Sequence, residues 1–424
     1  MSFSFQNAMC SIGRAILWSL ASISISHAQS FVPLSLDEAL SIATTRSPSL
    51  SAASQGIKAS QEAAIVGSQL PDPVLRLGVD NLPVTGPDSW RLTNDFMTQR
   101  RIGIAQEFVS EEKRGLVRRR MELDAQRQTA AQRSLAADIR RDVAAAWVGR
   151  YYATKSQALL KALEAEIDLQ LRTFDSQLRA GKAAASELSV ATAALLQTQD
   201  RLQVAKKQER LAGLTLKRWL GPDASRPSGN SPDIEKLAID LANPEIASNA
   251  PAVLEHARER DMSQADLEIT QAAKKPNWSW EVSYSQRGSA YSNMVSVGVN
   301  IPLFTNAANK QDRDISAKQA QVEQAHAMHE DIVREAQANM ASSYTEWQSL
   351  IARRKTLATA LLPVVRQRID LTLAAYRGGQ GNLAIVLEAR RAEVEAQLQL
   401  LDLERETARL WAQLQYVYAE GAQP

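Results

Sequence analysis

The residues of this sequence best suited to metal chemistry are two histidines three positions apart, His326 and His329. On a helix this spacing brings both imidazoles to one face, where Glu323 or Glu330 could complete a divalent-cation site. Histidines within a charged helix are more commonly just solvated. The two histidines therefore stay candidates, and the sequence predicts no metal centre and no cofactor.

No other residues have the spacing of an active site. The sequence shows no Ser-His-Asp order, phosphate-binding glycine loop or pair of acids that stands out. The long helices predicted below also offer no concave pocket for a substrate. We therefore predict that the protein is not an enzyme.

The first residues have the pattern of a secretory signal peptide. Arg14 precedes an apolar stretch at 15–25, and residues 26–28 (Ser-His-Ala) have the form of a cleavage site. We expect cleavage after residue 28. That cleavage removes the single cysteine, Cys10, so the exported protein would lack disulfides, cysteine metal ligands and a lipid-bearing cysteine.

Composition favours long helices over an enzyme-like sandwich or barrel, because 23% of residues are charged and only 5% are aromatic. A net charge of +2 gives no electrostatic argument for nucleic acid. After residue 28 no stretch approaches roughly 18 consecutive apolar residues, so no helical membrane span is predicted. The chain is expected to be soluble in the periplasm or to enter a membrane through strands.

Four segments alternate apolar residues with polar or small ones, at about 72–82, 100–109, 277–286 and 294–303. Each is about 10 residues long, as a tilted transmembrane strand requires. Aromatic residues suited to membrane interfaces accompany them: Trp90, Trp278, Trp280, Tyr284 and Tyr291. A soluble hairpin packed on a core would show the same alternation, but little other sequence could cover these apolar faces. The pattern therefore favours a membrane.

Four strands are too few for a transmembrane barrel, since single-chain barrels begin at about 8 strands. Closure then requires several chains. A homotrimer would supply three times four, or about 12 strands, in an ordinary closed symmetry.

Two very long helices follow the strand pairs. Residues 111–180 contain no proline, and about 70 helical residues extend roughly 100 Å. The matching stretch at 308–376 is interrupted by Pro363, which should kink it. Each helix turns at glycine, Gly181 or Gly378-Gly379, and returns through 188–220 or 383–419 with apolar residues at coiled-coil spacing.

The two halves repeat each other at a distance of roughly 200 residues, as Lys113 matches Lys310 and Tyr151 matches Tyr344. This distance exceeds the period of a solenoid and indicates duplication. The predicted organisation is a signal peptide at 1–28, a first repeat at 29–222 with its helical hairpin at about 111–220, a linker at 223–245, and a second repeat at 246–424 with its hairpin at about 308–420. The fold class is mainly α with a small β part.

The mature sequence resembles the TolC-like outer-membrane factors of tripartite efflux systems along its whole length. The resemblance is carried by Leu34-Ser35-Leu36-Asp37-Glu38-Ala39-Leu40, Ser47-Pro48, Pro71-Asp72-Pro73, the strand ending at Phe108, the strand ending Pro302-Leu303-Phe304, and both helical turns. The segments Asp80-Asn81-Leu82-Pro83 and 96–103 are similar to the heavy-metal (CzcC-like) branch.

The resemblance implies a homotrimer, with a 12-stranded barrel in the lipid of the cell outer membrane and a helical tunnel through the periplasm. It also implies a periplasmic adaptor (membrane fusion) protein and an inner-membrane pump of the RND type as partners. The exported substrates would be cations such as cobalt, zinc, cadmium, copper or silver. The turns would form the adaptor-docking tip: Arg179, Ala180, Gly181, Lys182, Arg377, Gly378, Gly379 and Gln380.

The family's gate pattern is only partly present. Tyr376 and Gly379 match it, whereas Gly381 replaces an arginine and Ile385 replaces the first of two acids. Glu388 matches the second acid, so the expected gate residues are Tyr376 and Glu388, with three Glu388 carboxylates facing one axis. An ordinary solvated helix face explains a lone glutamate equally well.

Two alternatives remain at the level of sequence. The same channel could carry drugs or other small molecules, because pump and adaptor choose the substrate. A soluble periplasmic coiled-coil adaptor or scaffold would also have long hairpins. An adaptor, however, would carry a single hairpin between β-rich domains that are absent from this sequence.

Overall fold

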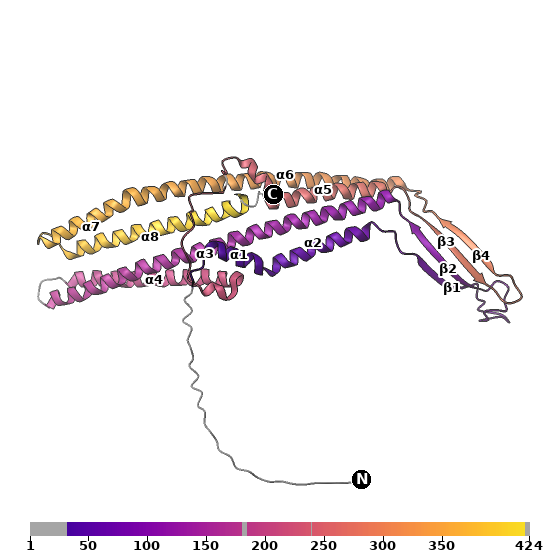
Figure 1. Ribbon diagram of the computed structural model, residues 1–424, viewed down its shortest axis with the longest axis horizontal. Helices are drawn as coiled ribbons and strands as arrows, with labels where there is room; N and C mark the ends of the chain where they lie inside the picture. The colour runs from indigo at the N-terminus through magenta and orange to yellow at the C-terminus, as the bar shows by residue number, and fades with distance from the viewer. Residues whose placement is uncertain (1–31, 180–184, 239, 420–424) are drawn as a thin grey trace, which may run out of the picture. The chain divides into compact units, whose positions relative to one another are not determined.

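The helices of residues 33–419 run side by side, and one small sheet lies at the end of the helical bundle (Figure 1). This computed structural model describes residues 32–179, 185–238 and 240–419. The predicted signal peptide at 1–28, with Cys10, lies outside the described residues. The predicted fold class, mainly α with a small antiparallel β part, is confirmed.

Two short helices open the described chain, and serine side chains cap both. In α1 (Leu36–Arg46) the Ser35 hydroxyl accepts from the backbone amide of Glu38 at 3.2 Å. In α2 (Pro48–Gly67) the Ser47 hydroxyl accepts from the amide of Leu50, and proline occupies the first turn. The Ser47-Pro48 pair therefore separates the two helices.

The longest elements are the hairpin helices. The first hairpin consists of α3 (Glu111–Arg179) and α4 (Ala185–Leu220). The second consists of α6 (Gln311–Thr356), α7 (Leu362–Arg377) and α8 (Leu383–Gln413). A π-helical turn at Leu357–Leu361 joins α6 to α7, and another follows α8 at Leu414–Ala419.

The interruption expected at Pro363 takes the form of this π-helical turn. A proline ring displaces the carbonyl four residues earlier and supplies no amide hydrogen. The wider π-helical turn directly before Pro363 absorbs that conflict, and α7 then starts with proline in its first turn.

Two further helices precede the strand pairs. The helix α2 precedes β1 (Val74–Asp80) and β2 (Gln99–Phe108), and α5 (Pro251–Ala272) precedes β3 (Trp278–Gln286) and β4 (Met294–Asn300). Short 3-10 turns lie at Gly221–Ser225, Pro244–Asn249 and Ala307–Asn309. Each half therefore has the order helix, two strands, long helix, returning helix.

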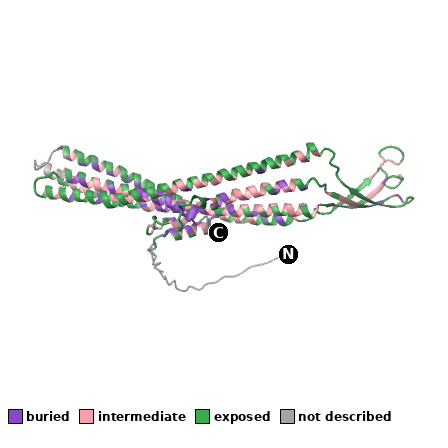
Figure 2. Cartoon of the chain, turned by 90° about the horizontal axis from the view of Figure 1, so that it is seen from above, coloured by how far each residue is buried: buried purple, intermediate pink, exposed green. Residues whose placement is uncertain are grey.

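Buried residues concentrate in the middle of the bundle (Figure 2). Two fully or largely buried tryptophans there make equivalent contacts. The indole nitrogen of Trp147 donates to the carbonyl of Leu34 at 3.1 Å, and that of Trp347 donates to the carbonyl of Ile234 at 3.1 Å. The duplication thus extends to Ile234, which lies within the segment predicted to be a linker.

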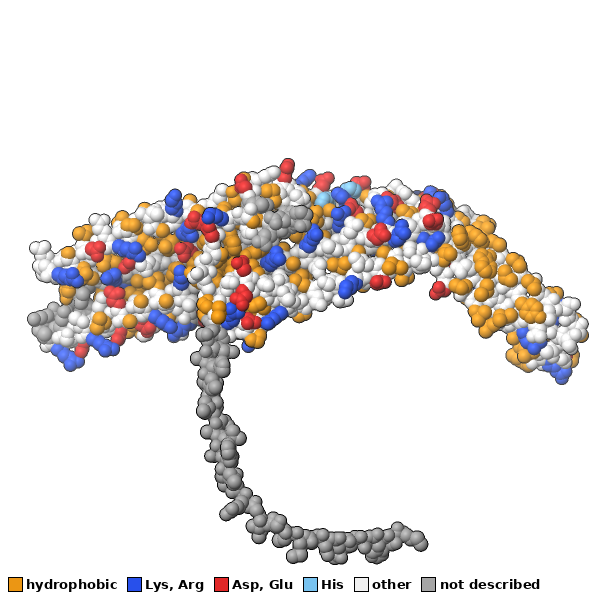
Figure 3. Space-filling view, viewed as in Figure 1, with side chains coloured by type: hydrophobic (Ala, Val, Ile, Leu, Met, Phe, Trp, Pro, Cys, Tyr) orange, Lys and Arg blue, Asp and Glu red, His pale blue; other side chains and the backbone are white. Residues whose placement is uncertain are grey.

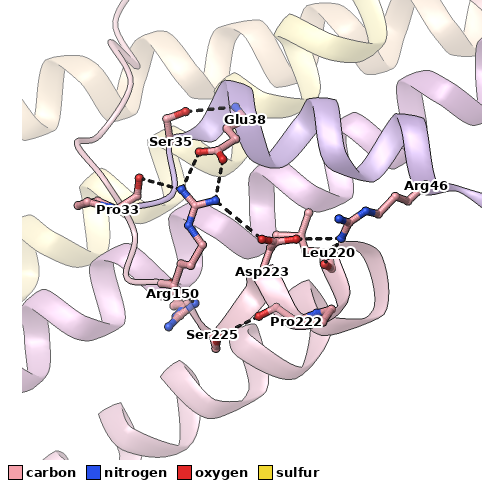
Figure 4. Close-up of polar contacts among 10 residues, drawn as sticks. Pro33, Ser35, Glu38, Arg46, Arg150, Leu220, Pro222, Asp223 and Ser225 are labelled. Atoms are coloured by element: carbon pink, nitrogen blue, oxygen red, sulfur yellow. Dashed lines mark hydrogen bonds and ion pairs between the residues drawn. The ribbon is translucent and has the colours of Figure 1, made fainter. Parts of the chain in front are cut away.

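Ion pairs fasten the N-terminal segment to the end of the first hairpin (Figure 4). The guanidinium of Arg226 donates to both carboxylate oxygens of Glu38, at 2.6 and 2.9 Å. Arg46 pairs with Asp223 at 2.8 Å and donates to the carbonyl of Leu220. The hydrogen bond from Arg226 lowers the pKa of Glu38.

Candidate functional site

The four strands form one antiparallel sheet in the order β1-β2-β3-β4. The pairing of β2 with β3 joins the two halves of the chain, with Ile102 opposite Tyr284 and Gly103 opposite Ser283. Among the described residues, β1 and β4 each pair along one edge only. The sheet is therefore open on both sides.

One face of this sheet is apolar and uncovered, and hydrophobic side chains gather over the strands in Figure 3. In the outer strands, Leu77 is 71% exposed and Val297 is 72% exposed. The face comprises Leu75, Leu77, Val79, Ile102, Ile104, Phe108, Trp278, Trp280, Val282, Tyr284, Val295, Val297 and Val299. A contiguous apolar face of this kind marks an interaction surface.

The opposite face carries small and charged residues. Ser283 and Ser285 of β3 are buried there. Arg76 pairs with Glu281 at 2.6 Å and Arg101 pairs with Asp80 at 3.2 Å, so charges of both signs lie across the strands. One apolar and one polar face is the pattern of a strand between lipid and water.

Aromatic residues occupy both ends of the sheet. At the end nearest the helices, Phe108 lies 5.3 Å from Trp278, measured between ring centroids. Near the loops, the amide of Asn293 donates to the Tyr284 hydroxyl, and the guanidinium of Arg287 covers Tyr291. Trp90 is 70% exposed in the loop between β1 and β2. This distribution suits two interfacial levels.

The end of α3, the start of α4 and the turn between α7 and α8 lie at the other end of the bundle from the sheet (Figure 1). Arg179 ends α3 and pairs with Asp175 at 2.5 Å. Ala180, Gly181 and Lys182, which the sequence placed at a docking tip, lie outside the described residues. In the second turn, Arg377 ends α7 and Gly378, Gly379 and Gln380 are all exposed.

Glycine is required at two positions of this second turn for different reasons. Gly379 has a φ of +71°, a backbone conformation that residues with a Cβ atom rarely adopt. At Gly381 a Cβ atom would lie 2.9 Å from the backbone nitrogen of Tyr376. A side chain at residue 381 would therefore require the backbone of this turn to shift.

Glu388 lies in the second turn of α8, and its side chain is 69% exposed. Its carboxylate accepts a hydrogen bond from Arg368 of α7 at 3.0 Å. Tyr376, the other expected gate residue, is half-buried at the end of α7. Sequence reasoning missed Arg368, because 20 residues and a turn separate it from Glu388.

Polar contacts join the two hairpins near Glu388. Arg201 of α4 pairs with Glu395 of α8, and Arg390 of α8 lies 3.5 Å from Glu166 of α3. A hollow of about 270 Å³ lies between the hairpins, and both Glu388 and Arg201 line it. The region around Glu388 is thus a charged surface shared by both halves of the chain.

The two candidate histidines differ in their exposure. His326 is exposed, whereas His329 is half-buried and lines a hollow between α5 and α6 with His256. No group of three or more His, Cys, Asp or Glu side chains that could hold a metal occurs among residues 32–179, 185–238 and 240–419. None of the described helices is both long and apolar enough to cross a membrane.

Comparisons with known proteins agree with this architecture. Residues 243–419 match the family described as outer membrane efflux protein. The chain is 23% identical over 383 residues to the cobalt-zinc-cadmium resistance protein CzcC of Cupriavidus metallidurans, covering 87% of this chain and 86% of CzcC.

Solved channels share the fold. The outer-membrane channel OprN superimposes with a TM-score of 0.78 at 16% identity, covering 92% of this chain and 91% of OprN. CusC, whose structures describe transmembrane channel formation, gives a TM-score of 0.76 at 15% identity and covers 91% and 92% of the two chains. The second half of this chain therefore matches the outer membrane efflux protein family, and residues throughout the chain share the fold of solved outer-membrane channels.

Proposed function

We propose that this protein is the outer-membrane exit duct of a tripartite efflux system and that it passes heavy-metal cations. The observation that carries the proposal is the uncovered apolar face of the four-stranded sheet, backed by a polar face with charges of both signs. Such a sheet is stable when lipid covers one face and water the other.

The open edges of the sheet support assembly. The amides and carbonyls along the outer edges of β1 and β4 need partners within a membrane, because lipid supplies none. Three copies joined edge to edge provide these partners and close about 12 strands into a barrel. The long hairpins of the three copies would then continue the barrel as a periplasmic tunnel.

The turn at Arg377, Gly378, Gly379 and Gln380 supports the docking role. It is exposed, it ends a hairpin, and it lies at the opposite end of the bundle from the apolar sheet. A periplasmic adaptor, linked to an inner-membrane pump of the RND type, would bind this turn and the one containing Gly181.

The similarity to CzcC favours cobalt, zinc or cadmium as cargo over drugs or other small molecules. The protein itself would work as a passive duct. The polar face of the sheet, which would line the duct, agrees with this cargo. Arg76, Glu281 and Ser283 make that face hydrophilic, so it can contact water and small ions.

Paired substitutions on one strand test the membrane assignment. Val297→Asp places a charge on the apolar face, whereas Ser296→Asp places the same charge on the opposite face of β4. Burying a carboxylate in lipid is unfavourable, so Val297→Asp should move the protein out of the outer-membrane fraction. Ser296→Asp should leave it there. Equal fractionation of the two variants would contradict the proposal.

The cargo is tested by deletion and complementation in the source cell. Loss of the protein should raise sensitivity to cobalt, zinc or cadmium, and the unaltered chain should restore resistance. Raised sensitivity to organic drugs alone would support the role as a duct but contradict metal cations as its cargo.

A further inference from the structure

A ladder of ion pairs crosses three strands on the polar face of the sheet. Two arginines and two carboxylates form this charge ladder: Arg76 and Asp80 of β1, Arg101 of β2 and Glu281 of β3. Nη1 of Arg76 donates to Oε2 of Glu281 at 2.6 Å. Nη1 of Arg101 lies 4.0 Å from Oε1 of Glu281, and its Nη2 donates to Oδ1 of Asp80 at 3.4 Å. The four charges of the ladder therefore alternate in sign and cancel.

Glu281 lies at the centre of the ladder, and its side chain is only 15% exposed. Each of its two carboxylate oxygens faces a different arginine. The arginines are more exposed, at 52% for Arg76 and 37% for Arg101. Because neighbouring positive groups compensate its charge, this carboxylate attracts a passing cation less than a free carboxylate would.

Small residues of β2 make room for the contact that skips a strand. Neighbouring strands lie about 4.8 Å apart, so Arg76 of β1 must cross β2 to reach β3. The β2 residue opposite Arg76 is Gly103, and the one opposite Glu281 is Ala105. A Cβ atom at Gly103 would lie 2.8 Å from that of Ser283, so no side chain fits there without a shift. The strand between the two charged residues thus leaves the guanidinium a path across it.

We propose that the charge ladder sets the charge selectivity of the part of the duct that the sheet forms. It keeps this lining near electrical neutrality, so that divalent cations pass without being held. The inference rests on the proposed function, in which the polar face lines the duct. A channel must bind its ion weakly enough to release it. A ring of unpaired carboxylates from three copies would retain divalent cations, and a ring of unpaired arginines would repel them.

A cysteine at position 296 can report the electrical potential beside the ladder. Ser296 of β4 is exposed, and it lies in the cross-strand row that runs through Ser283 and Gly103 to Arg76. The only cysteine of the sequence, Cys10, lies in the predicted signal peptide, so Ser296→Cys adds a single reactive thiol to the mature chain. The measurement compares the rates at which a positively and a negatively charged methanethiosulfonate modify this thiol in the purified protein in detergent.

Two substitutions in the Ser296→Cys parent should change the ratio of these rates in opposite directions. Glu281→Gln leaves two arginines without this partner, so the rate of the positive reagent relative to the negative one should fall at least about twofold at low salt. Arg76→Gln leaves Glu281 with Arg101 alone, 4.0 Å away, so the ratio should rise by a similar factor. The double variant should return to the ratio of the parent, since both charges of the pair are gone.

Arg100→Gln and Arg101→Gln make a matched control pair. Strand alternation places Arg100 on the apolar face with Ile102, whereas Arg101 lies on the polar face. Arg101→Gln should raise the ratio, and Arg100→Gln should leave it unchanged.

The outcomes separate this inference from the proposed function. A reactive thiol with the same ratio in Glu281→Gln and Arg76→Gln would overturn the charge ladder as the selectivity element and leave the duct standing. Equal shifts in Arg100→Gln and Arg101→Gln would overturn it in the same way. A thiol that neither reagent modifies would contradict the proposed function itself, and the inference with it, because the polar face would then not be open to water.

Discussion

The carboxylate of Glu388 has a cationic neighbour within its own chain, Arg368, at 3.0 Å. Both side chains are more than half exposed, so solvent weakens their attraction. A ring of three such glutamates would therefore present a partly neutralised surface to a passing cation. The strength of any cation preference then depends on the arginine as much as on the glutamate.

This pairing gives two substitutions with opposite expected effects in planar-bilayer recordings. Glu388→Gln should reduce cation selectivity, because it removes the negative charge. Arg368→Gln should increase it, because it removes the positive neighbour. Both effects should be largest at low salt, where the screening length reaches roughly 30 Å. Unchanged selectivity in both variants at low salt would place Glu388 outside the ion path.

Two glycines of the α7–α8 turn make a matched pair for stability. Gly381→Ala would place a Cβ 2.9 Å from the backbone nitrogen of Tyr376, so the turn must shift, at a cost of about 1–3 kcal/mol. Gly378 has a φ of −78°, and its Cβ would meet only ordinary contacts, so Gly378→Ala should change the unfolding free energy by less than about 1 kcal/mol. Thermal unfolding of both variants measures the two changes in unfolding free energy. A greater loss in Gly378→Ala would contradict this account of the turn.

At the scale of elements, the ion pair that joins α1 to the segment after the first hairpin requires an ionised Glu38 carboxylate. The pKa of Glu38 is lowered from 4.5 by the hydrogen bond from Arg226. A carboxyl with a lowered folded-state pKa stabilises the fold above its unfolded value, and this stabilisation is lost as the pH falls through the folded value.

Hydrogen exchange between pH 6 and about pH 3, corrected for the intrinsic rate, should therefore show α1 losing protection in acid. The loss should begin below pH 4.5, the ordinary value for this carboxyl. In Glu38→Gln the protection of α1 should be lower at pH 6 and should lack this transition. A transition that persists in Glu38→Gln would assign the acid sensitivity of α1 to another group.

The exposed turn between α7 and α8 gives a test of docking that avoids backbone strain. Gln380→Trp adds bulk at an exposed position of the turn, whereas Gln367→Trp makes the same change on exposed α7, away from the turn. Gln380→Trp should block export while the protein still reaches the outer membrane. Gln367→Trp should export normally. Export by both variants would remove this turn from the docking surface.

At the scale of the whole molecule, the sheet determines the assembly. Its apolar face and its two free edges support the proposed assembly, in which lipid would cover the face and three identical chains would provide the strands. The duplicated contacts of Trp147 and Trp347 make the two halves of each chain similar building blocks of that assembly.

Native mass measurement of the protein in mild detergent should accordingly give a trimer. Heating should convert the trimer to monomer on a gel, because the barrel closes only between chains. A stable monomer in native detergent solution would contradict the threefold assembly.

The sequence by itself determined the elements whose periodicity is local. Alternation over about 10 residues predicted all four strands. A long stretch without proline and a second one interrupted only at Pro363 predicted both hairpins, because period and chain geometry are set by near neighbours. The sequence predicted neither α2 nor α5. In α2 the reason is clear, because this helix is rich in serine, alanine and glutamine and has no clear apolar stripe.

Only the tertiary structure brought together residues that lie far apart in the chain. His256 of α5 and His329 of α6 line one hollow, and Arg368 donates a hydrogen bond to Glu388 across a turn. The carbonyl of Ile234 accepts from Trp347 as that of Leu34 accepts from Trp147. The requirement for Gly381 also appears only where two backbones meet. Spacing along a sequence records local geometry, whereas these contacts depend on how the packed helices bring distant side chains into one place.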